Sequence, residues 1–267
     1  NSAEQVVEQM VEELQSSDFQ PIAFEFGFGR NETLPPVQLK VNGVQVSISG
    51  FVDRVDGWEH NGRLYVRVMD YKTGHKSFDL TDVWHGLNLQ MLLYLFTLEE
   101  KGMPGVDRPV VPAGVLYLPA REEHLTGSRT MDEESRRKEL DSKLRRSGLI
   151  LNDPNVVDAM EHIPLGSEAR FLPVRVSKRT GAISGDALAS AVQLGKLRKH
   201  IHHILRQIAQ EIGSGNIQAD PWYRDERRTA CAWCDYASAC HFEDGRCGER
   251  SRYLYPVKGT EFWEQLE

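Results

Sequence analysis

The sequence predicts an α/β domain followed by a short cysteine-bearing tail. Runs of alternating apolar and polar residues, joined by two Asn-Gly pairs, favour antiparallel strands in the first third of the chain. Apolar residues at helical spacing dominate two long later segments. All four cysteines fall between Cys231 and Cys247. We therefore expect one α/β domain over residues 1–220 and a ligand-binding tail over residues 221–267.

The first elements are a helix and a set of strands. Ser2 followed by Gln5 resembles a capping box, and apolar residues at helical spacing come after it. Asn42-Gly43 and Asn61-Gly62 separate alternating apolar runs, so each pair predicts a hairpin turn. We expect a meander of three or four antiparallel strands at residues 22–28, 37–41, 44–56 and 64–71.

The later elements alternate between helices and strands. Residues 82–100 carry leucines on almost every side, which indicates a buried helix. The last helix should face the core with a stripe that includes Val192, Ile208 and Ile212. The elements expected after residue 100 are a strand at 110–118, a charged helix at 132–146, a strand at 171–176 and a long helix at 186–212.

The composition excludes several classes of protein. With 267 residues and 40% hydrophobic content, the chain can bury one large core. Its net charge of −7 gives no general argument for nucleic-acid binding, because purely electrostatic binders are usually basic. No apolar run approaches the roughly 20 residues that span a bilayer, and the first residues do not resemble a signal peptide. We expect a soluble cytoplasmic protein, and a piece of a longer chain.

Two aspartates are expected to meet on one hairpin. If Asn61-Gly62 forms a two-residue turn, counting back along both strands brings Asp53 opposite Asp70. Opposed like charges destabilise an antiparallel pair, so something must offset the repulsion. A divalent cation bound by both carboxylates would do so, and Lys72 adds a positive charge on the same face. Two solvated acids are the alternative, which we disfavour because this face is otherwise apolar and includes Phe51.

The chemistry that such a pair supports best is phosphodiester hydrolysis. Carboxylate ligands with few histidines nearby suit Mg²⁺ or Mn²⁺ rather than zinc. Lys72 could then orient the attacking water or neutralise charge in the transition state. Gln90 and Tyr94 lie four residues apart on the next predicted helix, so they share one face. Because this helix follows the strand that ends near Asp70, we expect both side chains to pack beside the acidic pair.

The cysteines have the spacing C-x2-C-x5-C-x6-C. Their crowding at one end of the chain favours metal or cluster ligation in a reducing compartment over disulfide bonds. Thiolates at short spacing can hold an iron–sulfur cluster or tetrahedral Zn²⁺, and the spacing does not choose between the two.

Several motifs follow one another in a defined order. They are G-F-V-D-R-V-D at 50–56, D-Y-K-T-G at 70–74 and L-N-L-Q-M-L-L-Y at 87–94, with F-E-F-G-F-G before them and C-A-W-C-D-Y-A-S-A-C after them. The three central motifs resemble those of the PD-(D/E)XK nuclease superfamily in its RecB-like branch. The full order is most similar to the C-terminal nuclease domains of the B subunits of bacterial AddAB helicase–nucleases.

The resemblance implies a restriction-endonuclease-like core, with a central mixed sheet flanked by helices. It also implies roles for six groups in the nuclease site and three in the tail. Asp53, Asp70 and the main-chain carbonyl of Tyr71 would bind Mg²⁺ or Mn²⁺, with Lys72 as the catalytic lysine and with Gln90 and Tyr94 completing the site. Cys231, Cys234 and Cys240 would bind a 4Fe-4S cluster, with Zn²⁺ as the alternative.

Two departures from the family pattern shape the expectations for this chain. In the family, a helix upstream of everything seen here supplies a His or Glu to the metal, so the site is expected to be incomplete and the chain alone to have little activity. The family's fourth cluster cysteine also lies far upstream. Cys247 could replace it or be an unrelated thiol, and the latter is favoured because the family pattern ends at Cys240.

By the resemblance, the function is metal-dependent DNA hydrolysis in double-strand-break repair. The expected substrate is a DNA strand, single-stranded at the nuclease site and delivered by a helicase partner subunit, with exonucleolytic cleavage. One alternative is a DNA-binding or scaffold module that keeps the fold without turnover, and another is a zinc-binding interaction module.

Overall fold

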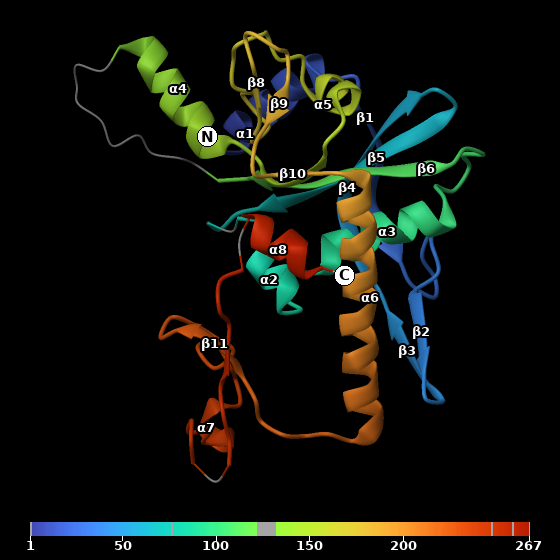
Figure 1. Ribbon diagram of the computed structural model, residues 1–267, viewed down its shortest axis with the longest axis vertical. Coiled ribbons are helices and arrows are strands. Elements are labelled where there is room, and N and C mark those ends of the chain that lie inside the picture. The colour runs from blue at the N-terminus through green and yellow to red at the C-terminus, as the bar shows by residue number, and fades with distance from the viewer. Residues whose placement is uncertain (1, 76, 122–131, 247, 258, 267) are drawn as a thin grey trace.

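A mixed six-stranded sheet forms the centre of the molecule in the computed structural model, which describes residues 2–75, 77–121, 132–246, 248–257 and 259–266. In spatial order the strands are β1 (Gln20–Phe28), β4 (Gly50–His60), β5 (Arg63–Lys72), β6 (Val110–Pro119), β7 (Ser147–Leu151) and β10 (Leu188–Ala189) (Figure 1). The pairs β5–β6 and β7–β10 are parallel, and the other neighbours are antiparallel. The expected mixed sheet is confirmed.

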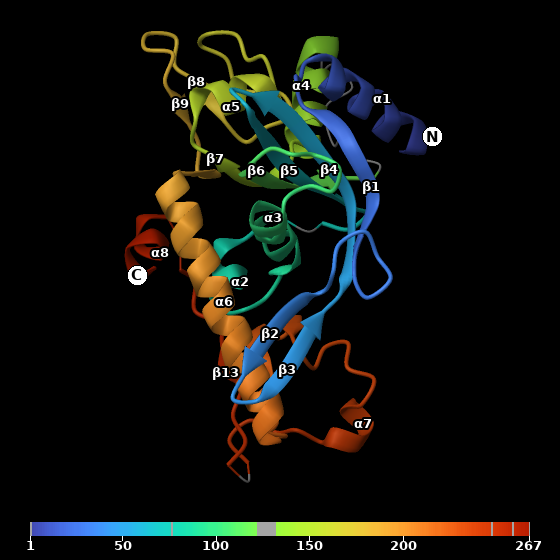
Figure 2. The same cartoon turned by 90° about the vertical axis from the view of Figure 1, so that its right-hand side faces the viewer.

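Helices cover both faces of this sheet (Figure 2). One face carries α1 (Ser2–Gln15), α4 (Glu133–Leu144) and α5 (Pro154–Met160). The other carries α2 (Leu80–Trp84), α3 (Gln90–Lys101), α6 (Ala191–Ser214) and α8 (Gly259–Gln265). The apolar α3 packs against β5 and β6 and is itself covered by α6. None of the described helices is both long and apolar enough to cross a membrane.

The hairpin between β4 and β5 forms as the sequence predicts. Asn61 and Gly62 have φ angles of 50° and 73°, the left-handed values that a type I′ turn requires. His60 pairs with Arg63, and the paired register continues along both strands to Arg54 and Met69. The side chains on this hairpin are therefore sorted between the two faces of the sheet as expected.

The predicted meander is wrong in its order. Strand 44–56 is interrupted at Ser49, so that β3 (Val44–Ile48) pairs with β2 (Val37–Val41) in a separate two-stranded sheet. β1 instead pairs directly with β4. The β2–β3 hairpin packs against α6 (Figure 2) so closely that a Cβ on Gly213 would lie 2.6 Å from Val44. Gly213 on α6 lies about 170 residues after Val44 in the sequence. The alternation of apolar and polar residues within the hairpin could therefore not reveal this packing.

Two predicted helices differ from those observed. The segment 82–100 is divided into α2 and α3, because Gly86 and Asn88 adopt left-handed φ angles of 83° and 54°. On α6, three residues of the predicted core stripe do not face the core. Val192 is 71% exposed, Ile208 44% and Ile212 63%. The helix extends well beyond the sheet (Figure 1), and the β2–β3 hairpin packs against it.

Two elements were missed between residues 147 and 160. β7 pairs with β6 and extends the sheet, and α5 follows it after the Asp153 cap. β7 needs Gly148, since a Cβ there would overlap the main-chain oxygen of Val115. The strand expected at 171–176 is reduced to β8 (Arg175–Val176), which pairs with β9 (Ile183–Ser184).

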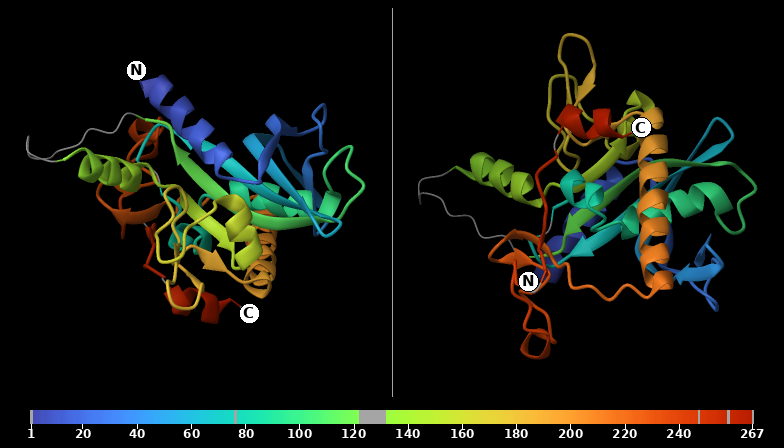
Figure 3. Two further views of the ribbon diagram at one scale, coloured as in Figure 1. Left: turned by 90° about the horizontal axis from the view of Figure 1, so that it is seen from above. Right: turned by 60° about the horizontal axis from the view of Figure 1, so that its bottom comes forward.

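The C-terminal tail lies apart from the sheet. It contains β11 (Trp222–Asp225), β12 (Arg228–Thr229), α7 (Ala237–Cys240) and β13 (Arg252–Tyr253). Figure 3 shows α7 projecting away from the main body. Arg224 anchors the tail to the start of α2, with nitrogens 3.3 Å from Asp79 Oδ2 and 2.6 Å from Asp82 Oδ1.

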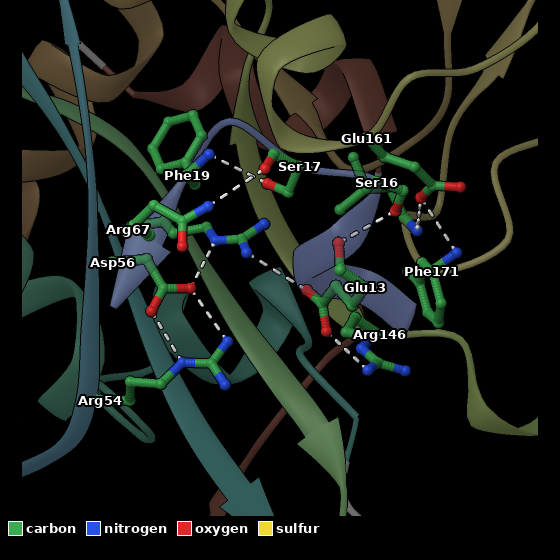
Figure 4. A network of polar contacts seen from close by, with 12 residues as sticks. Glu13, Ser16, Ser17, Phe19, Arg54, Asp56, Arg67, Arg146, Glu161 and Phe171 are labelled. Atoms are coloured by element: carbon green, nitrogen blue, oxygen red, sulfur yellow. Dashed lines mark hydrogen bonds and ion pairs between the residues drawn. The ribbon is translucent and has the colours of Figure 1, made fainter. Parts of the chain in front are cut away.

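A buried ion network joins the sheet to α1 (Figure 4). Asp56 lies between two arginines, with Oδ1 2.7 Å from Arg54 Nε and Oδ2 2.9 Å from Arg67 Nε. Arg67 Nη2 continues the chain to Glu13 Oε1 at 3.4 Å, and Glu13 Oε2 lies 2.6 Å from Arg146 Nη2. All five residues are buried. The polar side of α1 therefore faces inward, while Val7 and Val11 are about half exposed, at 57% and 48%.

The network makes the stability of the folded protein depend on the ionisation of Glu13. Burial acts to raise the pKa of Glu13, but the guanidiniums of Arg146, Arg67 and Arg54 outweigh it, so this pKa lies below its usual value of 4.5. The stabilisation from ionised Glu13 is therefore present above pH 4.5 and is lost as the pH falls through the lowered folded-state pKa.

Replacing Glu13 with glutamine is expected to lower the free energy of unfolding at neutral pH by about 3–5 kcal/mol, because buried guanidiniums lose their anionic partner. Urea denaturation measures this loss. The difference from wild type should narrow as the pH falls below 4.5, and it should disappear below the lowered folded-state pKa, where Glu13 of the folded wild-type protein is protonated as well. Glu8→Gln, on the exposed side of the same helix, is the control and should have little effect. Equal stability of Glu13→Gln and Glu8→Gln would contradict the expectation.

Candidate nuclease site

The acidic pair lies where β4 and β5 meet, on the face of the sheet that α3 covers. Continuing the register by one pair beyond Arg54 and Met69 places Asp53 opposite Asp70. Asp53 Oδ2 accepts a hydrogen bond of 2.8 Å from the main-chain N–H of Tyr71. Both aspartates are partly exposed, so they remain accessible to a ligand. The sequence-based juxtaposition of the two residues agrees with the structure.

Lys72 stands beside this pair. Its ammonium forms an ion pair with Asp70 Oδ2, and the two side chains are 27% and 19% exposed. The same ammonium lies 5.2 Å from the centre of the Tyr117 ring. Burial, followed by the charges of Asp70 and Asp82, raises the pKa of Tyr117 to about 12, so its ring remains neutral below that pH. Lys72 is thus held between a carboxylate and an aromatic face.

Gln90 and Tyr94 approach the site from α3. Gln90 is the exposed first residue of this helix, and its Nε2 lies 3.5 Å from both the main-chain oxygen of Phe51 and the Tyr94 hydroxyl. Tyr94 is buried and stacks on Phe28, with ring centres 4.5 Å apart and planes at 8°. Burial raises the pKa of Tyr94. The pair therefore meets β4 beside Asp53, as the sequence predicts.

The donors in this site fit a hard divalent cation. Asp70 Oδ2 is buried, and its partner is the Lys72 ammonium, which balances its charge. Two carboxylates and a nearby main-chain carbonyl are oxygen donors of the kind that Mg²⁺ and Mn²⁺ bind. Within the described ranges, no three His, Cys, Asp or Glu side chains form a group that could hold a metal ion. Two carboxylates alone leave room for water and substrate oxygens.

The tail cysteines are not arranged as a metal centre. Cys231, Cys234 and Cys240 are exposed free thiols. Among the residues that the structure describes, these three thiols do not form a group that could hold a metal ion. Short main-chain hydrogen bonds, such as Cys240 N to Tyr236 O at 2.8 Å, hold this stretch. Cys247 lies outside the described residues.

Sequence reasoning missed two residues of the site and misplaced one. Tyr117 reaches Lys72 only through the parallel pairing of β5 with β6, which no local pattern encodes. Arg54 was visible within the G-F-V-D-R-V-D motif, and a charge inside an apolar strand was the signal. Phe51 was expected to be buried beside Asp53, but its side chain is 51% exposed.

Close packing at the start of β4 makes a glycine necessary. A Cβ on Gly50 would overlap the Tyr94 hydroxyl and lie 3.1 Å from its Cζ. Since Tyr94 is buried and stacked, its ring has little room to move.

Gly50→Ala is therefore expected to lower the free energy of unfolding by about 1–3 kcal/mol through overpacking. Gly195→Ala is the matched control, because nothing lies within 4 Å of the added Cβ. On the helix α6 this control should raise stability by roughly 0.5–1 kcal/mol. Urea denaturation of both variants is the measurement. A Gly50→Ala protein as stable as wild type would contradict the expectation, because the Tyr94 ring would then move aside at no cost in stability.

Known proteins are similar to this chain over nearly its whole length. The B subunit of the ATP-dependent helicase/deoxyribonuclease of Acetivibrio thermocellus is 32% identical over 258 residues, which cover 96% of this chain. The same-named proteins of Thermoanaerobacter sp. strain X514 and Clostridium novyi strain NT are also 32% identical over 258 residues. The chain spans 22% of the length of these relatives.

The family comparison extends over most of the chain. Residues 1–241 match the PD-(D/E)XK nuclease superfamily. The matched range includes the β4–β5 hairpin, α3 and the three described cysteines. The resemblance carried by the sequence motifs is thereby confirmed, and the chain belongs to the PD-(D/E)XK nuclease superfamily.

Proposed function

We propose that this chain is the nuclease domain of a helicase–nuclease subunit and hydrolyses DNA phosphodiester bonds with Mg²⁺ or Mn²⁺. The observation that carries the proposal is the meeting of Asp53, Asp70 and Lys72 at the end of β5 in a PD-(D/E)XK chain. The named activity of the relatives, an ATP-dependent helicase/deoxyribonuclease, is consistent with it.

Each residue has a role that its surroundings allow. Asp53, Asp70 and the main-chain carbonyl of Tyr71 would hold the metal, which when bound polarises a phosphoryl oxygen and lowers the pKa of water. The Lys72 ammonium is placed to exchange its contact with Asp70 for a phosphate oxygen. The exposed Gln90 amide can donate a hydrogen bond to the substrate, and Tyr94 supports Gln90 from below.

The substrate and setting are part of the same proposal. We propose a single DNA strand, delivered by a helicase partner during double-strand-break repair in the cytoplasm and cleaved from an end. The intact acidic pair and lysine favour turnover over a scaffold that only binds DNA. The same three residues favour an enzyme over a zinc-binding interaction module whose function would depend on the tail cysteines.

In the longer protein of which this chain is expected to be a piece, Asp70→Asn is expected to reduce Mg²⁺-dependent cleavage of a labelled single-stranded oligonucleotide by about two orders of magnitude or more, because it removes an anionic ligand worth several kcal/mol. Asp107→Asn is the control, since this exposed aspartate precedes β6 at the opposite end of the β5–β6 pair. It should cleave at the wild-type rate. Equal rates for wild type and Asp70→Asn would rule out the catalytic assignment.

We also propose that Cys231, Cys234 and Cys240 bind a 4Fe-4S cluster, as their order in the tail suggests. Their exposure supports the proposal, because the thiols are accessible to iron. Binding requires the stretch to rearrange, since its thiols are not gathered in this structure.

Protein purified without oxygen is expected to be brown and to absorb near roughly 400 nm, as thiolate-ligated iron does. Iron and sulfide analysis should find both elements, and Cys234→Ser should lower both. A colourless protein that contains zinc in place of iron would contradict the assignment.

A further inference from the structure

The two faces of the β4–β5 hairpin carry different chemistry. Successive side chains on a strand point to opposite faces. Asp53 and Asp70 therefore lie on the α3 face, while Arg54 and Tyr71 lie on the α1 face, where the buried ion network is located (Figure 4). Arg54 and Tyr71 are each the immediate neighbour in sequence of a residue in the acidic pair.

A hydrogen bond links this network to the main chain of the site. Arg54 Nη1 donates to the Tyr71 hydroxyl at 3.0 Å, and the guanidinium lies 5.8 Å from the centre of the Tyr71 ring. Arg54 is fully buried, and Asp56 holds its other nitrogens at 2.7 and 2.9 Å. The guanidinium therefore has a fixed position from which it can hold Tyr71.

Beyond the Arg54–Met69 pair, hydrogen bonds from side chains link β4 to β5. The paired register of β4 and β5 runs from His60–Arg63 to Arg54–Met69. Next along the hairpin, Asp53 accepts from the Tyr71 main-chain N–H on one face, and Arg54 donates to the Tyr71 hydroxyl on the other. Tyr71 is thus fastened to β4 from both faces of the sheet.

The strand spacing at this point decides the geometry of the acidic pair. Asp53 belongs to β4, whereas Asp70 and the Tyr71 carbonyl belong to β5. A cation bound between them needs these oxygens at a defined separation, within a few tenths of an ångström. A group that fixes β5 against β4 beside the pair therefore influences binding without contacting the ligand.

We propose that Arg54 is a positioning residue of the nuclease site: from the opposite face of the sheet, it holds the Tyr71 side chain and so sets the separation of Asp53 and Asp70. Asp56, and behind it Arg67 and Glu13, keep Arg54 in place. This role rests on the proposed function, because it concerns the same metal-binding pair.

Tyr71→Phe tests the proposal with the smallest change. It removes the hydroxyl that Arg54 contacts but keeps the ring, the N–H that binds Asp53 and the carbonyl proposed as a ligand. Tyr65→Phe is the matched control, since Tyr65 lies on the same strand and the same face, six residues away. Arg146→Met tests the far end of the network, where a change should affect stability alone.

Two readouts separate positioning from a structural role. Calorimetry without DNA gives the Kd for Mn²⁺, and steady-state cleavage of a single-stranded oligonucleotide gives kcat and KM. For Tyr71→Phe we expect the Kd for Mn²⁺ to rise and kcat to fall by about tenfold, the factor for losing one hydrogen bond to a charged group, with KM for DNA unchanged. Tyr65→Phe should match wild type, and Arg146→Met should unfold more easily while the folded protein binds Mn²⁺ normally.

Three results would overturn the proposal. The first is a Tyr71→Phe protein that binds Mn²⁺ and cleaves DNA as wild type does. The second is a Tyr65→Phe or Arg146→Met protein that weakens Mn²⁺ binding as much as Tyr71→Phe. The third is a wild-type protein, complete with the upstream segment that the site is expected to need, that neither binds Mn²⁺ nor cleaves DNA; it would overturn the proposed function, and this inference with it.

Discussion

The pairing of β4 with β5 is the constraint on which the rest of the structure depends. A two-residue turn at Asn61-Gly62 sets the register, and a slip by one residue would exchange the faces of one strand relative to the other. Asp53 and Asp70 would then lie on opposite faces of the sheet, and Arg67 would leave Asp56 for the face that the apolar helix α3 covers. One turn therefore controls both the acidic pair and the buried charges behind it.

The buried charges constrain the fold more than they stabilise it. Taking three guanidiniums and two carboxylates out of water has a large desolvation cost, which mutual attraction only partly offsets. Each ion nevertheless needs its partner, because an unpaired buried charge is far less favourable. The position of α1 under the sheet is thus specified by Glu13, which must reach Arg67 and Arg146 together. Val7 and Val11 contribute little to this position, since both are about half exposed, whereas Val6 and Met10 pack against the core.

The site combines a rigid base with an open edge. β4, β5 and β6 lie under it, and the Tyr94 ring and the Tyr117 ring pack around it as buried neutral aromatics. Gln90 and Phe51 remain exposed at its rim. A rigid floor suits two carboxylates that must keep a fixed separation, and an exposed rim suits a polymeric substrate that enters from solvent. This division is consistent with a nuclease of the PD-(D/E)XK superfamily.

The sequence by itself determined the features that are local in the chain. The Asn61-Gly62 turn and the alternation around it were enough to bring Asp53 opposite Asp70, and helical spacing was enough to place Gln90 with Tyr94. Only the tertiary structure decided where the β2–β3 hairpin packs, how α2 separates from α3 and which residues surround Lys72 and Arg54. The surroundings of Arg54, for example, depend on a network whose members lie far apart in sequence, such as Glu13 and Arg146, which are 2.6 Å apart. Turns and periodicities are encoded within a few residues, whereas such partners are selected by the packing of the whole chain.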